Sequence, residues 1–395
     1  GLISLSDEAI SLSGFNYESQ NLRVEGNLGH APGDGLFGDV ELSVSPSILD
    51  SRTKDTWTFL GDINYSGSIT GGMSSPVIDG LVAGSLEWTY GMKRVPKVFA
   101  FENLSGAVSL SPENGLVLTD VAGDYGGGEL SVSGVFTKEL EVHGLSLDVT
   151  ESQFDLIIGD MVGHPEPWVD FDGDSTIVVS GTLRPFDLSG EISIDATNAN
   201  AWNRPERTPE SLYLSFPHLT AVGTITAQPG NLELNFSHVR SPSSDVAIRT
   251  HSKFGPRGST EVFFSTDSLY LPDLTPLGGL ELQGYGAVEG YFKNAKWHDP
   301  EFSADVDFVD FGAIGYQFMD SVSAHIGAIN FSPLSIDNIR GNVGDSEFTG
   351  RLRYEFSSDE PLAVDFSTVA GRIEDFLPHF TPVDGVEGEL FMSMH

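Results

Sequence analysis

Few residues of this sequence combine the types and spacing that chemistry requires. Asp170, Asp172 and Asp174 alternate around a glycine, and this arrangement of carboxylates is partly like a calcium-binding loop. The segment lacks the glutamate that ends such a loop, because Leu183 and Arg184 fall near that position. Asp-Gly pairs are also ordinary turn formers. We therefore predict a turn here and no metal, with calcium at the three aspartates as the alternative.

Other candidate motifs are equally incomplete. The glycine-rich segment Gly123–Gly128 has no Lys-Ser/Thr after it and precedes a strand pattern, so it predicts a hairpin turn rather than a phosphate cradle. Neither an HExxH nor a GxSxG motif occurs, and His143 and His379 are isolated. Asp120 and Asp124 could serve a glycosidase, but solvated turns are the default in so acidic a chain. We expect neither catalysis nor a cofactor.

Composition excludes several classes of protein. The 395 residues include 20 Lys+Arg against 57 Asp+Glu, a net charge of −37, so the clustered cations that nucleic acid requires are missing. The same deficit excludes a basic patch for anionic membranes. The sequence has no Cys, which excludes disulfides and thiolate chemistry. It also has no run of 18 apolar residues, and it begins Gly1-Leu2-Ile3 without a leader, which suggests an excised piece of a longer chain.

Alternation of apolar and polar residues with period two dominates the sequence. In Phe348–Phe356 the even positions are apolar or glycine, whereas the odd positions are polar or charged. This pattern is typical of a strand with one dry and one wet face. Similar runs separated by turn residues predict about twenty to twenty-five antiparallel strands. Only Ser152–Val162, Thr266–Leu277 and Gly371–Phe380 favour short helices.

Two markers recur at intervals of roughly a hundred residues, which indicates an internal repeat. One is a small-residue pivot at Gly71, Gly181, Gly290 and Gly388; the other comprises Val24–Gly26, Val132–Gly134, Ile248–Thr250 and Phe348–Gly350. We predict a partial repeat over 1–70, repeats over 71–180, 181–289 and 290–387, and the start of a truncated repeat over 388–395.

Three short helices cannot cover the apolar face of so many strands. The face must therefore belong to a row of sandwiches, to a closed barrel, or to a long curled sheet whose apolar side lines a trough. Repetition favours the curled sheet. A lining rich in Phe, Leu and Val would suit acyl chains, although the alternation alone favours a row of ordinary sandwiches.

The repeat resembles that of the TamB and AsmA-like family. The likeness is carried by Gly67–Gly80, Phe101–Leu110, Gly115–Gly123 and Gly126–Gly134, with a second copy in Leu334–Gly350, and it extends over essentially the whole chain. It implies an all-β fold, an elongated repetitive antiparallel sheet curled into a U-shaped β-taco groove with a few short helices. It further implies a periplasmic bridge between inner and outer membranes, anchored by segments outside this chain.

The resemblance also implies function and partners. Such a bridge would hold and conduct phospholipid acyl chains, and it could support outer-membrane protein assembly through a barrel partner that binds other parts of the parent chain. The candidate groove residues are the apolar members of the alternating strands: Val132, Phe136, Leu232, Leu234, Phe236, Val306, Phe308, Phe348, Leu352, Tyr354, Phe356, Val364 and Phe366.

Two other functions remain open on the residues alone. The first is an extracellular array of acidic β-sandwiches that acts as a structural or adhesive stalk, stiffened by calcium at Asp170–Asp174. The second is a β-rich enzyme acting on glycans, which would require an acid pair facing a cleft.

Overall fold

The computed structural model describes residues 1–5, 9–33, 35–47, 57–90, 97–154, 156, 169–202, 208, 212–254, 258–274, 281–295, 298–313, 315–330, 333–355, 362–375, 388–391 and 393–394. The chain divides into two compact units, Gly1–Ala196 and Thr197–His395. The predicted repeat boundaries stay a prediction, and Phe356 and His379 lie outside the described residues.

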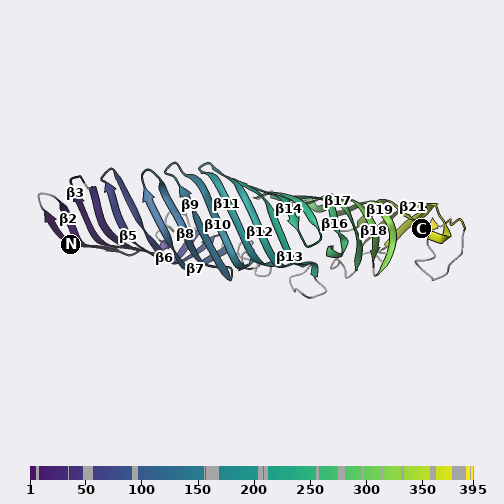
Figure 1. The fold of residues 1–395 in the computed structure, drawn as a ribbon, viewed down its shortest axis with the longest axis horizontal. Coiled ribbons are helices and arrows are strands. Elements are labelled where there is room, and N and C mark those ends of the chain that lie inside the picture. Colours follow the sequence, from purple (N-terminus) through teal and green to yellow (C-terminus); the bar gives the residue numbers. More distant parts are fainter. Residues whose placement is uncertain are drawn as a thin grey trace. The chain divides into compact units, whose positions relative to one another are not determined.

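The first unit is an antiparallel meander in which each strand pairs with its neighbour along the chain (Figure 1). Its strands are β1 (Leu2–Leu5), β2 (Ile10–Ser19), β3 (Leu22–Ala31), β4 (Gly35–Val44), β5 (Trp57–Gly72), β6 (Ser75–Tyr90), β7 (Lys97–Ser111), β8 (Gly115–Tyr125), β9 (Gly128–Phe136), β10 (Glu141–Gln153), β11 (Val169–Leu183) and β12 (Phe186–Trp202), whose last residues belong to the second unit.

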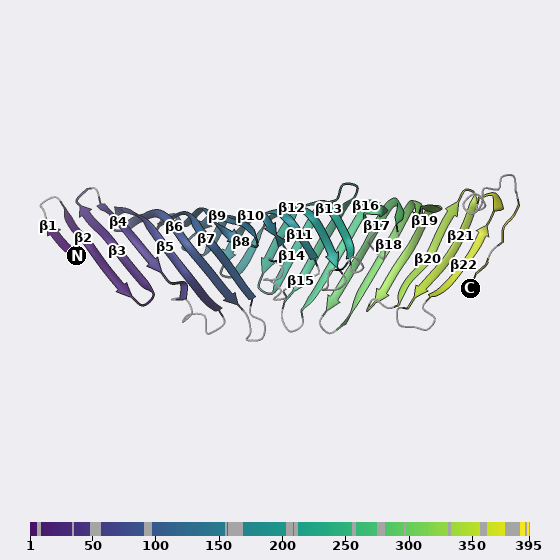
Figure 2. The same ribbon diagram turned by 90° about the horizontal axis from the view of Figure 1, so that it is seen from below.

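The second unit repeats this order, and Figure 2 shows β17 to β22 following one another side by side. Its elements are β13 (Leu212–Gln228), β14 (Asn231–Arg240), β15 (Asp245–Lys253), β16 (Ser259–Tyr270), the 3-10 helix η3 (Leu271–Leu274), β17 (Leu282–Ala295), β18 (His298–Ala313), β19 (Tyr316–Ile329), β20 (Leu334–Val343), β21 (Ser346–Tyr354), β22 (Leu362–Ala370) and β23 (Ser393–Met394). The prediction of an all-β antiparallel fold with twenty to twenty-five strands is confirmed.

The helical predictions were partly wrong. Ser152 and Gln153 continue β10, and Thr266–Tyr270 complete β16, so the helical turn begins only at Leu271. Thr266 explains the extension of β16, because its hydroxyl donates to the Asp245 carbonyl oxygen on the neighbouring strand at 2.7 Å. The prediction was wrong here because the composition of these residues is compatible with a helix, whereas the strand alternation continues into them.

Hairpin turns follow the glycines. Gly126 and Gly127 form the two-residue loop between β8 and β9, with φ of 61° and 81°, which residues other than glycine rarely adopt. The predicted turn at Gly123–Gly128 is therefore confirmed. Gly230, with φ of 76°, occupies the equivalent loop between β13 and β14.

Bulges interrupt the strands of the first unit in a recurrent way. At four of the register shifts a residue has positive φ, and a side-chain oxygen from the following strand accepts its backbone N–H. The pairs of N–H donor and acceptor side chain are Gly14 with Asn27, Asp120 with Ser133, Gly144 with Ser180, and Glu151 with Asp174, at 2.8 to 2.9 Å. Such bulges bend and twist a sheet without leaving the extra N–H unsatisfied.

Candidate functional site

The apolar faces of the two units are the candidate site, because alternation and register align their side chains across many strands. In the first unit one row crosses β2 to β10 in register. Its members are Leu12, Leu28, Gly38, Ile69, Ile78, Leu110, Leu116, Phe136 and Val142. Val132 and Phe136 share a face of β9, so both predicted residues belong to this surface.

The second unit carries an equivalent row across β14 to β22. Its members are Phe236, Ile248, Phe264, Gly290, Ala304, Ile326, Ile336, Leu352 and Val364. Three of the predicted residues stand in this row. The others on this unit lie in parallel rows of the same face: Leu232, Leu234, Val306, Phe308, Phe348, Tyr354 and Phe366.

Burial divides these residues into two groups. Val306, Phe308 and Phe348 are less than a tenth exposed, and the first two belong to a core cluster with Leu271 of η3. Leu352 and Phe366 pack against that cluster but remain half-buried, as do Leu234, Phe236 and Val364. The buried members act as core, and the half-buried members form an accessible apolar surface.

In the second unit η3 contacts β13, β16 and β17, and its Leu271 is only 2% exposed. This helix therefore covers one part of the apolar face.

Aromatic rings cover glycines of neighbouring strands on these faces. Phe264 lies over Gly290, Phe348 over Gly341 and Phe366 over Gly350, each close to where a glycine Cβ would be. Tyr65 covers Gly80 in the first unit in the same way. Burial, and to a lesser extent the Asp79 carboxylate, raises the pKa of the Tyr65 phenol.

The sequence analysis missed this pairing, although the signal was available. An aromatic residue that falls in register opposite a mid-strand glycine predicts such cover, because the ring occupies the space that a missing side chain leaves. The pivot at Gly290 is one instance, since Phe264 is its direct partner across β16 and β17.

The opposite face of the second unit is mainly polar, although Phe263 and Tyr291 also lie on it. One row across β15 to β20 comprises Ala247, Ser265, Glu289, Asp305, His325 and Asp337. A shallow pocket of about 540 Å³ on this face is lined by Asp267, Glu289, Asp305 and Asp307 together with His238 and Asp245. Carboxylate side chains dominate the lining of this pocket.

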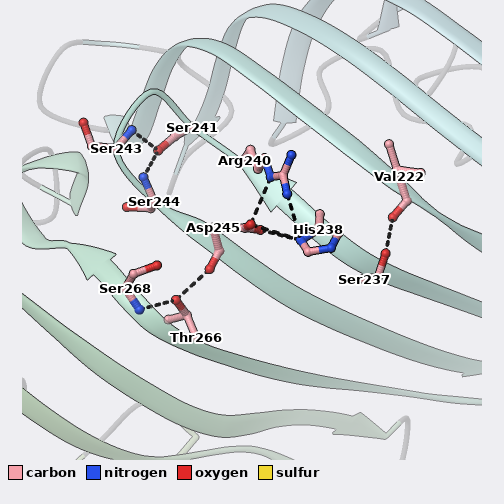
Figure 3. A network of polar contacts seen from close by, with 10 residues as sticks. All are labelled: Val222, Ser237, His238, Arg240, Ser241, Ser243, Ser244, Asp245, Thr266 and Ser268. Atoms are coloured by element: carbon pink, nitrogen blue, oxygen red, sulfur yellow. Dashed lines mark hydrogen bonds and ion pairs between the residues drawn. The ribbon is translucent and has the colours of Figure 1, made fainter.

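The main polar network lies at the turn between β14 and β15 (Figure 3). Arg240 Nε donates to Asp245 at 2.9 Å, and His238 Nδ1 lies 3.0 Å from the same carboxylate. Burial alone would raise the pKa of the Asp245 carboxyl, but the hydrogen bonds and charges of Arg240 and His238 together lower it. These contacts join the end of β14 to the start of β15 across their turn.

The acidic residues considered for chemistry have structural partners. Asp174 accepts the Glu151 N–H, Asp120 binds Ser133, and Asp124 accepts the Asn103 side-chain amide at 2.5 Å. His143 is exposed, and its Nε2 lies 3.4 Å from the Glu141 carboxylate. The described residues hold no group of three metal-ligating side chains, so Asp170, Asp172 and Asp174 do not converge on one point.

No protein-family model, curated protein or solved structure matches the chain. Among the helices of the described residues, none is long and apolar enough to cross a membrane. The apolar faces are therefore interpreted from their own geometry.

Proposed function

We propose that the chain is a segment of an AsmA-like bridge that holds phospholipids on its apolar faces and conducts them between the two membranes of a bacterial envelope. One observation carries the proposal: apolar side chains stand in register across β2 to β10 and across β14 to β22. A continuous apolar track of this kind lets an acyl chain move between equivalent positions without crossing a polar barrier.

Energetics support a lipid ligand for such a surface. Transfer of one methylene from water to an apolar surface gains about 0.8 kcal/mol, so a whole acyl chain outweighs the cost of ordering it. The half-buried Leu352 and Phe366 are the best placed for this contact, because they are accessible and still packed on the core cluster. The curled U-shaped groove and the periplasmic location belong to the same proposal.

The test is organic extraction and mass spectrometry of the purified chain, with an unrelated acidic β-protein handled identically. We expect stoichiometric phospholipid on the wild type. Leu352→Glu with Phe366→Glu should remove it, because two carboxylates would stand where acyl chains bind. Circular dichroism would establish that the double variant retains its strands.

A matched control uses the opposite face of the same two strands. Thr349→Glu with Ala363→Glu adds the same charge to β21 and β22 on the polar side, and lipid content should not change. Lipid at background level on the wild type, or equal loss in both double variants, would contradict the proposal. The stalk hypothesis would then be favoured.

A further inference from the structure

Another pocket lies on the polar face of the second unit, beside the acidic pocket described above. Its volume is about 330 Å³, which is at the lower end of the range for small-molecule sites, about 300–1,000 Å³. We call it the sheet pocket. Its lining comes from β17 to β20 and includes Tyr291, Glu301, Ser303, His325, Gly327 and Ser335.

The sheet pocket is hollow over Gly327, because this residue has no side chain. Tyr291, Ser303, Gly327 and Ser335 are consecutive members of one row across β17, β18, β19 and β20. Apart from its chain neighbours, a Cβ at Gly327 would have Ser335 Oγ at 3.3 Å and His325 Nε2 at 3.9 Å as its nearest described atoms. The space above the glycine is therefore bordered by hydrogen-bonding groups.

Hydrogen bonds orient the polar groups that border this space. Asp305 Oδ1 lies 2.8 Å from His325 Nδ1, and in the tautomer whose Nδ1–H donates to this carboxylate, Nε2 is an acceptor. Ser303 Oγ lies 3.5 Å from the same Nε2. Ser335 Oγ donates to the Gly327 carbonyl oxygen at 3.2 Å. Each serine oxygen also has lone pairs that can accept a hydrogen bond from a ligand.

The Tyr291 ring forms one wall of the sheet pocket and is held by its neighbours. Its hydroxyl donates to Glu301 Oε1 at 2.5 Å, and this hydrogen bond raises the pKa of the phenol. Lys293 Nζ lies 4.4 Å from the centroid of the ring, and the Phe263 ring centroid lies 6.3 Å from it. A ring that is already fixed provides contact area to a ligand at little cost in ordering.

The sheet pocket opens to solvent above the polar face. The His325 side chain is 38% exposed, and Ser303, Gly327 and Ser335 are partly exposed. Ser303, His325 and Gly327 lie within β18 and β19, with a paired strand on either side. A ligand therefore reaches Gly327 from above the sheet.

The chemistry of the lining matches a sugar ring. A pyranose has hydroxyl groups that both donate and accept hydrogen bonds, and C–H faces that pack on aromatic and aliphatic side chains. The sheet pocket offers carboxylate, hydroxyl and imidazole groups to the hydroxyls, and Tyr291 and Ile329 to the C–H faces. The Glu301 carboxylate in the lining and Asp305 behind His325 disfavour an anionic sugar.

We propose that the sheet pocket binds a neutral sugar ring of a glycan. The ring packs on Tyr291 over Gly327, and its hydroxyl groups form hydrogen bonds with Ser303, His325 and Ser335. The site does not depend on lipid, because the pocket and the apolar face lie on opposite sides of the same strands. A glycan held on the polar face leaves the apolar face free.

Saturation-transfer difference NMR on the full chain tests the site, with triacetylchitotriose and maltotriose as neutral probes and trigalacturonate as an anionic one. We expect a neutral trisaccharide to bind with a Kd on the order of 1 mM, because the pocket is open and small. Trigalacturonate should not bind. Gly327→Val should weaken binding about tenfold or more, since the new side chain fills the hollow. Ser335→Ala, which removes one hydrogen bond, should weaken it about threefold.

Thr349→Val is the matched control, because it removes a hydroxyl from the polar face of β21 outside the sheet pocket. Binding should not change in this variant, and circular dichroism would establish that all variants keep their strands. Failure of both neutral probes to bind the wild type, or wild-type binding by a folded Gly327→Val variant, would overturn the site. Equal binding of trigalacturonate would overturn the neutral class. Extracted phospholipid, measured on the same samples, reports separately on the proposed function.

Discussion

At the scale of single residues, the sheet is packed by aromatic rings that lie over glycines of neighbouring strands. A methyl group at Gly341 would lie 2.5 Å from Phe348 Cζ. Phe348 is 8% exposed, so its ring has no free space to move into. The ring in turn shields the backbone at the glycine, which would otherwise be exposed to solvent. Glycine is therefore required at this position because the neighbouring ring leaves no space for a side chain, and not because of its own φ.

Gly341→Ala is expected to destabilise the second unit by about 1–3 kcal/mol, the usual cost of overpacking a core. Gly327→Ala in β19 is the control, because its nearest neighbour would be Ser335 Oγ at an accommodating 3.3 Å. Urea unfolding of both variants measures the difference. A Gly341→Ala variant as stable as Gly327→Ala would mean that the ring does not depend on the glycine.

At the scale of elements, the second unit contains two copies of one hydrogen-bonded latch. In the first copy Ser244 Oγ donates to Asp273 at 2.7 Å and accepts the Tyr270 N–H at 2.9 Å. In the second copy Ser346 Oγ donates to Asp375 at 2.7 Å and accepts the Arg372 N–H at 2.7 Å. All three positions are offset by the same number of residues, roughly a hundred, which agrees with a repeat of that length.

Each latch fastens a short segment after a strand to the turn two strands earlier. Ser346→Ala should cost about 1–3 kcal/mol, because Ser346 is fully buried and its loss leaves the Arg372 N–H without its acceptor and removes one of two hydrogen bonds to Asp375 Oδ2. Ser244→Ala should have a similar cost, whereas Ser335→Ala on the polar face should have little. Hydrogen exchange in the turn between β20 and β21 reports the loosening, and unchanged protection there would refute a role for the latch.

Alternation was sufficient to predict the strands and the face on which their apolar residues lie. It could not locate the bulges, because one extra residue at Asp120 changes the parity between Leu118 and Val121 within a single strand. It also could not separate Phe308 from Leu352. Both have the same period, but Phe308 belongs to the core cluster that includes Leu271 of η3, whereas Leu352 packs against that cluster and stays half-buried, and this difference depends on contacts distant in sequence.

At the scale of the whole molecule, the described core is unevenly distributed. The cluster of buried residues around Leu271, Val288 and Phe308 lies within the second unit. The first unit has fewer buried apolar side chains among its described residues, of which Val142 is the most enclosed. In a meander each strand contacts chiefly its neighbours, so stability is a sum of local terms.

Phe308→Ala tests this local organisation. Removal of a ring that is 8% exposed should destabilise its surroundings by about 3 kcal/mol. Hydrogen exchange by mass spectrometry should become faster across β16 to β20, where the cluster lies, and stay unchanged across β4 to β9. Val142→Ala should produce the reverse pattern in the first unit. Faster exchange in both units from either single change would mean that the chain unfolds as one cooperative body, and its stability would then depend on more than contacts between neighbouring strands.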